Sequence, residues 1–278
     1  GSEMCIRDRI LGLECTLNPF LTNPVHREIA DLPLAERVAA LRDGEIRSRL
    51  LAEATERSRD KLGGNLISRF DLLFEMGDEP DYEPSLDTSI AAVAARRGVT
   101  PEEVALDVML ADDGHGLIYL PFLNYVDGNL DGCHEMLTHP HTVPGLADGG
   151  AHVGTICDGS FPTTLLAYWG RDRDHDRIPL PFLVKRHCRD TARTVGLLDR
   201  GVIAPGYRAD LNVVDFDRLR LHKPTSVHDL PAKGRRLLQR AEGWRHTIVA
   251  GQETYHDGTA TDALPGRLIR GAQPAPKG

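Results

Sequence analysis

One short apolar segment constrains the fold of this chain more than any other feature. Residues 142–147 (TVPGLA) form an apolar run that predicts a buried strand ending at Asp148, and Gly149, Gly150 and His152 follow at once. Active sites of α/β barrels are built on the loops that follow their strands, so this aspartate fits a catalytic residue of a barrel. Spacing alone favours a plainer alternative, a tight turn in which two glycines after Asp148 form the bend.

The chemistry of these residues is consistent with the catalytic interpretation. An aspartate at a strand end can take a proton from a metal-bound water and pass it to a leaving group. Gly149 and Gly150 carry no Cβ, so the backbone can pass close to a ligand or a metal there. Asp148 is therefore the candidate catalytic residue.

Other reactive residues near this segment have simpler explanations. His139 and His141 could share one strand face as metal ligands, but Pro140 between them weakens a strand, so we expect solvated or hydrogen-bonded histidines. Cys157 is expected to be a small, buried apolar residue, and the charged run 171–177 a solvated loop. Eight further histidines lack ligand spacing and are expected at the surface or in helices: His115, His134, His175, His187, His222, His228, His246 and His256.

Local signals predict helices before Gly201 and strands after it, which indicates an α/β fold class. Thr100 is expected to cap a helix, with Pro101 in the first helical position and Glu103 completing a capping box. The other expected helices cover residues 31–41 (with Asp31 as N-cap), 45–61, 129–137, 160–169 and 180–197. Residues 78–84 are expected to form a loop, and residues 208–215 and 246–251 to form strands.

Composition excludes several classes of function. The chain has 41 acidic against 33 basic residues and a net charge of -8, which argues against a nucleic-acid partner. Its apolar runs are far shorter than the roughly 20 residues that cross a bilayer, so no membrane span is expected. The five cysteines contain no CxxC pair and do not suggest a disulfide framework, which favours a reducing compartment such as the cytoplasm.

The two ends of the chain have unusual sequences. Residues 1–9 fit a translated sequencing adapter rather than native protein, so we expect the chain to be a C-terminal fragment. The alternative is a short disordered tail. Residues 265–278 are rich in glycine, proline and arginine and are expected to be flexible.

Three stretches carry a resemblance to a known group of enzymes: residues 146–169, 197–217 and 246–258. Together they resemble the closing third of amidohydrolase-superfamily enzymes, and most closely the N-acyl-D-amino-acid deacylases, or D-aminoacylases. The similarity runs from Leu11 to Arg270. The pattern GVIAPGYRADL from Gly201 is specific for the superfamily, and Asp148-Gly-Gly-Ala-His152 points to the deacylase branch.

The resemblance implies a fold and a role for each site residue. It implies a metal-dependent (β/α)8 barrel beside a small β-sandwich domain built from both chain ends. Residues 10–200 would belong to the barrel, with an insertion at 33–131 over its mouth, and residues 201–264 to the small domain. Asp148 would end the eighth strand as the general base, with a possible contact to zinc, and His152 would support the site.

Departures from the family pattern limit what the chain can do alone. The remaining metal ligands of the family would lie upstream of this chain, and His139 and His141 cannot replace them because they come only seven to nine residues before Asp148. Ala147 stands where the family usually has serine, and no arginine matches a holder of the substrate carboxylate. The fragment alone is therefore expected to be inactive.

The sequence thus predicts part of a zinc-dependent hydrolase for N-acyl-D-amino acids, in which Asp148 moves the proton. A cyclic-amide hydrolase of the same superfamily is one alternative. A non-catalytic binding or assembly module on the same scaffold is another, since one fold hosts many functions. The expected partner is a small-molecule substrate, and the pattern does not define the oligomeric state.

Overall fold

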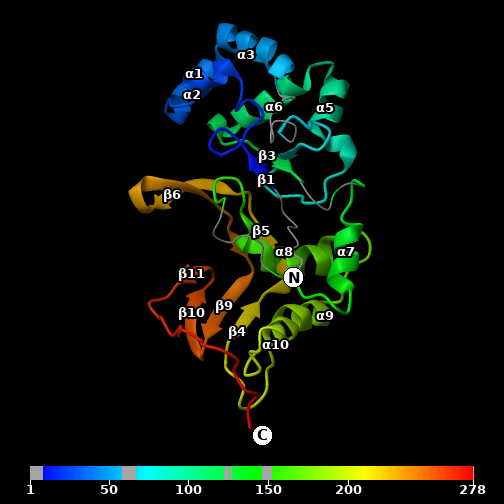
Figure 1. Cartoon of the computed structure of the whole chain (residues 1–278), viewed down its shortest axis with the longest axis vertical. Coiled ribbons are helices and arrows are strands. Elements are labelled where there is room, and N and C mark those ends of the chain that lie inside the picture. Colours follow the sequence, from blue (N-terminus) through cyan, green and yellow to red (C-terminus); the bar gives the residue numbers. More distant parts are fainter. Residues whose placement is uncertain (1–8, 58–66, 122–124, 126, 146–151, 278) are drawn as a thin grey trace.

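The computed structural model describes residues 9–57, 67–121, 125, 127–145 and 152–277 of the chain. It is a mixed α/β structure, elongated along one axis (Figure 1). A helical part with a small sheet lies at one end and a four-stranded sheet lies at the other. Helices α7 (Asp131–Thr138) and α8 (Phe161–Ala167) lie between them, and α9 (Leu180–Lys185) lies beside the four-stranded sheet.

At the helical end, five helices of the described residues pack around a three-stranded antiparallel sheet of order β1-β3-β2. The strands are β1 (Arg9–Leu11), β2 (Phe74–Met76) and β3 (Leu117–Leu120). The helices are α1 (Pro24–Ile29), α2 (Leu34–Arg42), α3 (Gly44–Arg57), α5 (Ile90–Arg97) and α6 (Pro101–Leu110). All four residues of β3 are buried, because it is the central strand and helices cover it.

Helix α6 begins as its sequence predicts. Thr100 Oγ1 accepts from the backbone N–H of Glu103, and the Glu103 carboxylate accepts from the backbone N–H of Thr100 at 2.8 Å. Two N–H groups that a helix start leaves unpaired are satisfied in this way. Val104 and Met109 of this helix are buried in the core.

Four short helices and two π turns of the described residues follow one another between residues 131 and 194. They are α7 (Asp131–Thr138), α8 (Phe161–Ala167) with a π turn at Tyr168–Asp172, and α9 (Leu180–Lys185), followed by a π turn at Arg186–Asp190 and α10 (Thr191–Thr194). Short 3-10 turns occur at Leu86–Thr88, Asp112–Gly114, Asp158–Ser160, Phe216–Arg218 and Pro231–Lys233. Trp169 is fully buried between these helices and is the largest side chain of this core.

The remaining strands lie after residue 210, as the sequence predicts. The four-stranded antiparallel sheet has the order β11-β10-β9-β4, with β4 (Leu211–Val214), β9 (Trp244–Val249), β10 (Gln252–His256) and β11 (Thr259–Ala260). Two small ladders join β5 (Arg220–Leu221) to β8 (Ala241–Glu242) and β6 (Thr225–Leu230) to β7 (Gly234–Leu238). Ala250 and Gly251, both with positive φ, form the tight turn between β9 and β10.

Several local predictions are confirmed. Helices occur where they are expected around residues 129–137, 160–169 and 180–197, and residues 78–84 form a loop. Helix α2 is also found, but Pro33 rather than Asp31 occupies its N-cap position. The last residues of the helix expected over 45–61 lie outside the described residues.

The buried strand expected at 142–147 is wrong over its described part, residues 142–145. Thr142 Oγ1 instead donates to the carbonyls of Met136 and His139, at 2.5 and 3.0 Å, and folds the chain back onto the end of α7. Pro144 has no N–H with which to extend a strand ladder.

The barrel that the resemblance implies is not confirmed. All ladders between the strands of the described residues are antiparallel.

Gln273, in the segment expected to be flexible, is held by backbone hydrogen bonds to Gly196 and Leu198.

Candidate active site

The candidate catalytic segment is only partly described. Asp148, Gly149 and Gly150 lie outside the described residues, which resume at His152. His152 is exposed and has a φ of 51°. Its carbonyl accepts hydrogen bonds from the N–H groups of Thr155 and Ile156, at 2.9 and 3.0 Å, so residues 152–156 form a compact turn.

This turn is fixed by two strands that are distant in sequence. Ile10 N in β1 donates to Thr155 O at 2.8 Å, and Thr155 Oγ1 donates back to Ile10 O at 2.9 Å. Leu237 N in β7 donates to Val153 O at 2.7 Å. The residues that follow Asp148 in sequence are therefore held between β1 and β7.

Gly154 is required by a close approach in the same turn. Thr16 N donates to Gly154 O at 2.8 Å, so the two backbones run side by side. A Cβ at residue 154 would lie 2.2 Å from Thr16 Oγ1, which is shorter than any van der Waals contact. A glycine is the residue that fits here without moving Thr16.

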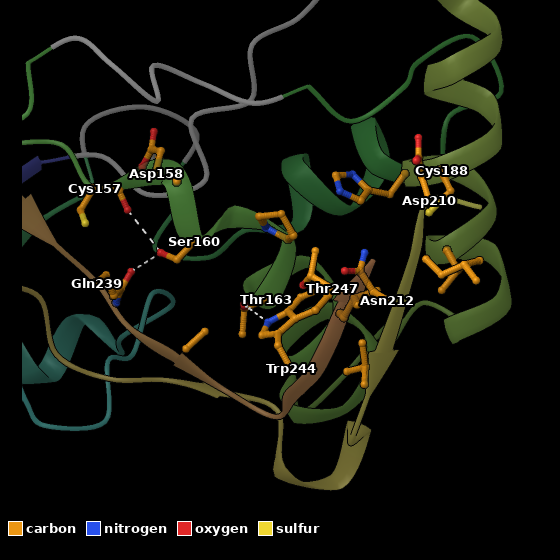
Figure 2. Close-up of a pocket in the computed structure, with 18 of the residues that line it drawn as sticks. Cys157, Asp158, Ser160, Thr163, Cys188, Asp210, Asn212, Gln239, Trp244 and Thr247 are labelled. Atoms are coloured by element: carbon orange, nitrogen blue, oxygen red, sulfur yellow. Dashed lines mark hydrogen bonds between the residues drawn. The ribbon is translucent and has the colours of Figure 1, made fainter. Parts of the chain in front are cut away.

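A cavity of about 760 Å³ opens beside residues 153–160 (Figure 2). Its walls come from this segment, α8, the turns around α9 and α10, and strands β4, β7 and β9. The lining is mostly apolar and includes Val153, Ile156, Leu166, Val202, Leu211, Val214, Leu237 and Trp244. Its volume and apolar character are those of a small-molecule site.

Polar side chains join the walls of the cavity. Ser160 Oγ lies 2.5 Å from Gln239 Oε1, and Gln239 Nε2 donates to Tyr82 Oη at 2.7 Å. In α8, which directly follows Ser160, Thr163 Oγ1 accepts a hydrogen bond from Trp244 Nε1 at 2.9 Å (Figure 2). These contacts fix the rotamers of the polar residues that a bound ligand would meet.

Burial shifts the pKa of two titratable residues that line the cavity. Burial lowers the pKa of His187 below its ordinary value, so the imidazole is neutral at physiological pH. His187 Nδ1 is buried and has no hydrogen-bond partner within the described part of the chain. Burial raises the pKa of the Cys188 thiol, which therefore stays protonated and is a poor nucleophile.

The described residues around this cavity do not fit a metal ion. Within the ranges that the structure describes, two sets of three potential ligands converge, His246–Glu253–His256 and Glu83–Asp131–His175. Neither set lines the cavity. The ring centres of His139 and His141 are 5.5 Å apart, and the backbone N–H of His141 donates to His139 Nδ1 at 3.2 Å. Both histidines are exposed, so the pair is hydrogen-bonded and solvated as expected.

The prediction of a solvated loop at 171–177 is wrong for Arg173. Its side chain is 1% exposed, and its guanidinium lies 5.0 Å from the ring centre of Trp169. Glu83, 90 residues earlier, neutralises it. Alternating charges in sequence gave no sign of this distant partner.

Comparison with known families decides the relationship. A family model described as "Amidohydrolase family" matches residues 12–255 of the chain. The chain belongs to the amidohydrolase family. The resemblance expected from the sequence is thereby confirmed at the level of the family.

Curated relatives of this amidohydrolase include two proteins named 5-methylthioadenosine/S-adenosylhomocysteine deaminase, from Desulfitobacterium hafniense strains DSM 10664 / DCB-2 and Y51. Each is 32% identical over 95 residues, which cover 31% of this chain and 22% of the relative. The match thus spans about a fifth of the length of these relatives.

Solved structures similar to the amidohydrolase chain include two D-aminoacylase crystal structures. A D-aminoacylase is 22% identical with a TM-score of 0.38, covering 69% of this chain and 36% of that one. A D-aminoacylase mutant in complex with CuCl2 is 23% identical with a TM-score of 0.39, covering 71% and 37%. Because these TM-scores are low, the assignment rests on the family model.

In the described residues, no helix is long and apolar enough to cross a membrane.

Proposed function

We propose that a protein containing this chain hydrolyses the amide bond of N-acyl-D-amino acids. The observation that carries the proposal is the family match over residues 12–255, which includes the segment Asp148-Gly-Gly-Ala-His152. The proposed products are a carboxylate and a free D-amino acid. The apolar cavity beside residues 153–160 supports the proposal, because it offers room for the acyl group next to that segment.

In the proposed reaction Asp148 acts first as general base and then as general acid. Its carboxylate takes a proton from the attacking water as the C–O bond forms, and gives that proton to the nitrogen as the C–N bond breaks. Gly149 and Gly150 let the substrate approach the backbone, and His152 supports the site. These roles follow from the resemblance and belong to the proposal.

Zinc is the proposed metal of the whole protein, with Asp148 as one contact. The described residues around the cavity supply no set of three ligands, so no step of the reaction above is routed through the ion. For the same reason we propose that the 278-residue chain alone is inactive. The (β/α)8 barrel, the small β-sandwich domain, the mouth insertion over residues 33–131 and a cytoplasmic location are further parts of this proposal.

The proposal is tested by replacing Asp148 in a protein that contains this chain together with the sequence encoded upstream of it. Release of the free amino acid is measured with N-acetyl-D- and N-acetyl-L-amino acids. We expect hydrolysis of the D-series and a fall in kcat of about 10²- to 10⁴-fold in Asp148→Asn, the range for loss of a general base. Asp127→Asn, an exposed control, should keep the activity.

Circular dichroism shows whether Asp148→Asn is folded, and its zinc content shows whether it still binds the metal. Near-normal turnover in a folded variant would reject Asp148 as the proton carrier. Hydrolysis of cyclic amides but not of N-acyl-D-amino acids would replace the proposed substrate by that of a cyclic-amide hydrolase.

A non-catalytic binding module remains the second candidate, favoured by the lack of a metal-binding set around the cavity among the described residues. It predicts that the longer protein hydrolyses none of these substrates and yet binds apolar small molecules in the cavity. Turnover of any amide substrate that depends on Asp148 would exclude it.

A further inference from the structure

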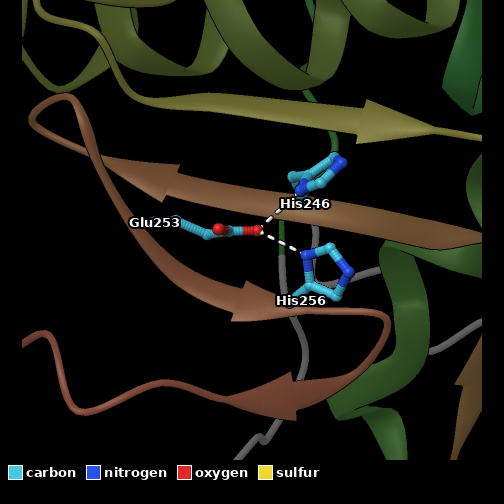
Figure 3. Close-up of side chains that lie close together, drawn as sticks. All are labelled: His246, Glu253 and His256. Atoms are coloured by element: carbon cyan, nitrogen blue, oxygen red, sulfur yellow. Dashed lines mark hydrogen bonds and ion pairs between the residues drawn. The ribbon is translucent and has the colours of Figure 1, made fainter.

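The β9–β10 hairpin brings two imidazoles and a carboxylate together on one face of the four-stranded sheet. His246 in β9 and His256 in β10 are directly opposite each other in the antiparallel ladder. Their Nδ1 atoms lie 2.6 and 2.9 Å from the same oxygen, Oε1 of Glu253 (Figure 3). The two imidazole ring centres are 4.8 Å apart.

A β-bulge is what places all three side chains on this face. Glu253 and His256 are three residues apart, a spacing that puts side chains on opposite faces of a regular strand. The ladder pairs Glu253 with Ile248 but Tyr255 with Thr247, so Thr254 is an extra residue. This one-residue shift returns His256 to the face of Glu253 and His246. Bulges that re-aim a side chain in this way are common beside binding sites.

We propose that His246, Glu253 and His256 bind a divalent transition-metal ion of the Zn²⁺ class. Imidazole nitrogen and carboxylate oxygen are the ligands that Zn²⁺, Ni²⁺ and Cu²⁺ prefer. The three ligand atoms lie within 4.8 Å of one another, which a single ion can bridge. The site goes beyond the proposed hydrolase, whose reaction involves none of these residues.

The coordination that this arrangement allows is open on one side. The side chains of His246, Glu253 and His256 are 38%, 39% and 57% exposed, so the remaining positions of the ion face water. Tetrahedral zinc separates neighbouring ligand atoms by about 3.3 Å, so the present hydrogen-bond distances need to open by several tenths of an ångström. In the loaded state each neutral ring has a lone pair on Nδ1 and carries its proton on Nε2.

Charges around the cluster favour a cation. Glu253 supplies a carboxylate to the cluster, and Asp257 is a second acidic residue beside it. Asp257 Oδ2 lies 3.6 Å from His256 Nε2, the ring nitrogen that would face away from the ion. Carboxylates in this position orient metal-binding histidines. The nearby cation Arg245 is paired with Asp257 and Asp215, at 3.0 Å each.

The cluster is separate from the candidate active site. Asn212 of β4 and Thr247 of β9, which are neighbours in the ladder, line the apolar cavity (Figure 2). His246 precedes Thr247 in the same strand and therefore points to the opposite face of the sheet. An ion at the cluster would cross-link β9 to β10 and would lie outside the cavity.

The experiment is Zn²⁺ titration of the full 278-residue chain by calorimetry, with Co²⁺ absorption as a second report on coordination. The exposed pair His139 and His141 is removed by His139→Ala/His141→Ala to suppress adventitious binding. We expect this background protein to bind one Zn²⁺, with at least tenfold weaker binding in His246→Ala and His256→Ala. Glu253→Gln and Asp257→Asn should weaken binding about tenfold. His228→Ala, an exposed histidine on β6, should bind as the background does.

Stability measurements keep the test decisive if a variant folds poorly. Zn²⁺, but not Mg²⁺, should raise the Tm of the background protein, because an ion that binds the folded chain stabilises it. The rise should be lost in Glu253→Gln, and Asp148→Asn should keep it. The proposal would be overturned if both histidine variants bound Zn²⁺ as tightly as the background protein does, or if binding disappeared when His139 and His141 are removed.

Discussion

Arg173 and Glu83 form a buried bidentate ion pair, in which Nε and Nη2 of the arginine each lie 2.9 Å from a carboxylate oxygen. The Tyr168 hydroxyl and the backbone N–H of Leu130 donate to the same carboxylate. This network ties the loop at residues 78–84 to the turn that follows α8. Both partners of the pair are withdrawn from water, which strengthens a polar link between these distant segments.

Arg173→Met is expected to lower the free energy of unfolding by about 3 kcal/mol, because it leaves a nearly buried carboxylate without its counter-charge. Glu83→Leu in the same protein should recover part of the loss. The check is urea denaturation followed by far-UV circular dichroism. Arg69→Met, which breaks an exposed pair with Asp71, should cost less than about 1 kcal/mol. Equal effects of the two arginine variants would contradict a special role for the buried pair.

Acid should destabilise the fold through His26. Burial, helped by the positive charge of Arg37, lowers the pKa of His26 from 6.5 to about 4. Between these values the unfolded chain binds a proton that the folded chain does not, so stability is complete above pH 6.5 and falls as pH drops towards 4. The slope from this group reaches about 1.4 kcal/mol per pH unit.

The measurement for His26 is the difference in free energy of unfolding between the wild type and His26→Gln as a function of pH. The difference should change between pH 6.5 and 4 and be constant at higher pH. A flat difference curve for His26→Gln would show that folding does not lower the pKa of His26.

Gly116 is expected to tolerate no side chain. A Cβ there would lie 1.7 Å from the carbonyl oxygen of Val108 and 2.8 Å from its carbonyl carbon, both backbone atoms of α6. Gly116→Ala should therefore lose about 2–3 kcal/mol or more in thermal or urea unfolding, since α6 has to move away from β3. Gly44→Ala, at the start of α3 with open space around it, should be neutral or stabilising by up to about 1 kcal/mol. A mild effect at Gly116 would mean that the packing of α6 on β3 is loose.

The apolar cavity should be visible by fluorescence. The chain has two tryptophans, and Trp244 lines the cavity while Trp169 is buried elsewhere in the core. An apolar dye such as anilinonaphthalene sulfonate is expected to bind there and to quench tryptophan emission by energy transfer. Trp244→Phe should remove most of that quenching without abolishing dye binding. Unchanged quenching in Trp244→Phe would place the dye at another site.

The parts of the fold that the sequence predicts are those encoded within a few residues. The capping box at Thr100 and Glu103 is local, and its bonds form as expected. The strands around residues 208–215 and 246–251 are also local patterns. The apolar run at 142–147 failed over residues 142–145 because hydrogen bonds from Thr142 to the end of α7 outweigh β propensity.

Contacts between residues that are distant in sequence, including the polar clusters outside the candidate site, were predicted less completely, for two physical reasons. The charge run at 171–177 gives no sign of whether Arg173 is buried, since that depends on Glu83, 90 residues away. His246 and His256 lack ligand spacing in sequence, and a regular register from the turn at Ala250 would have paired His246 with Tyr255. Only the bulge at residue 254 brings the two imidazoles together. Asp148 lies outside the described residues, so its role stays a prediction.

The paired hydrogen bonds between Ile10 and Thr155 join residues 145 positions apart. During synthesis on the ribosome β1 emerges before its contact at Thr155, which becomes available only 145 residues later. Until then the turn at residues 152–156 cannot pack against β1, and this edge strand of the small sheet stays uncovered. Contacts of such long range slow folding. Premature stops before Thr155 should therefore yield nascent chains that depend on chaperones, whereas stops after Leu238 leave both anchors of the turn in place.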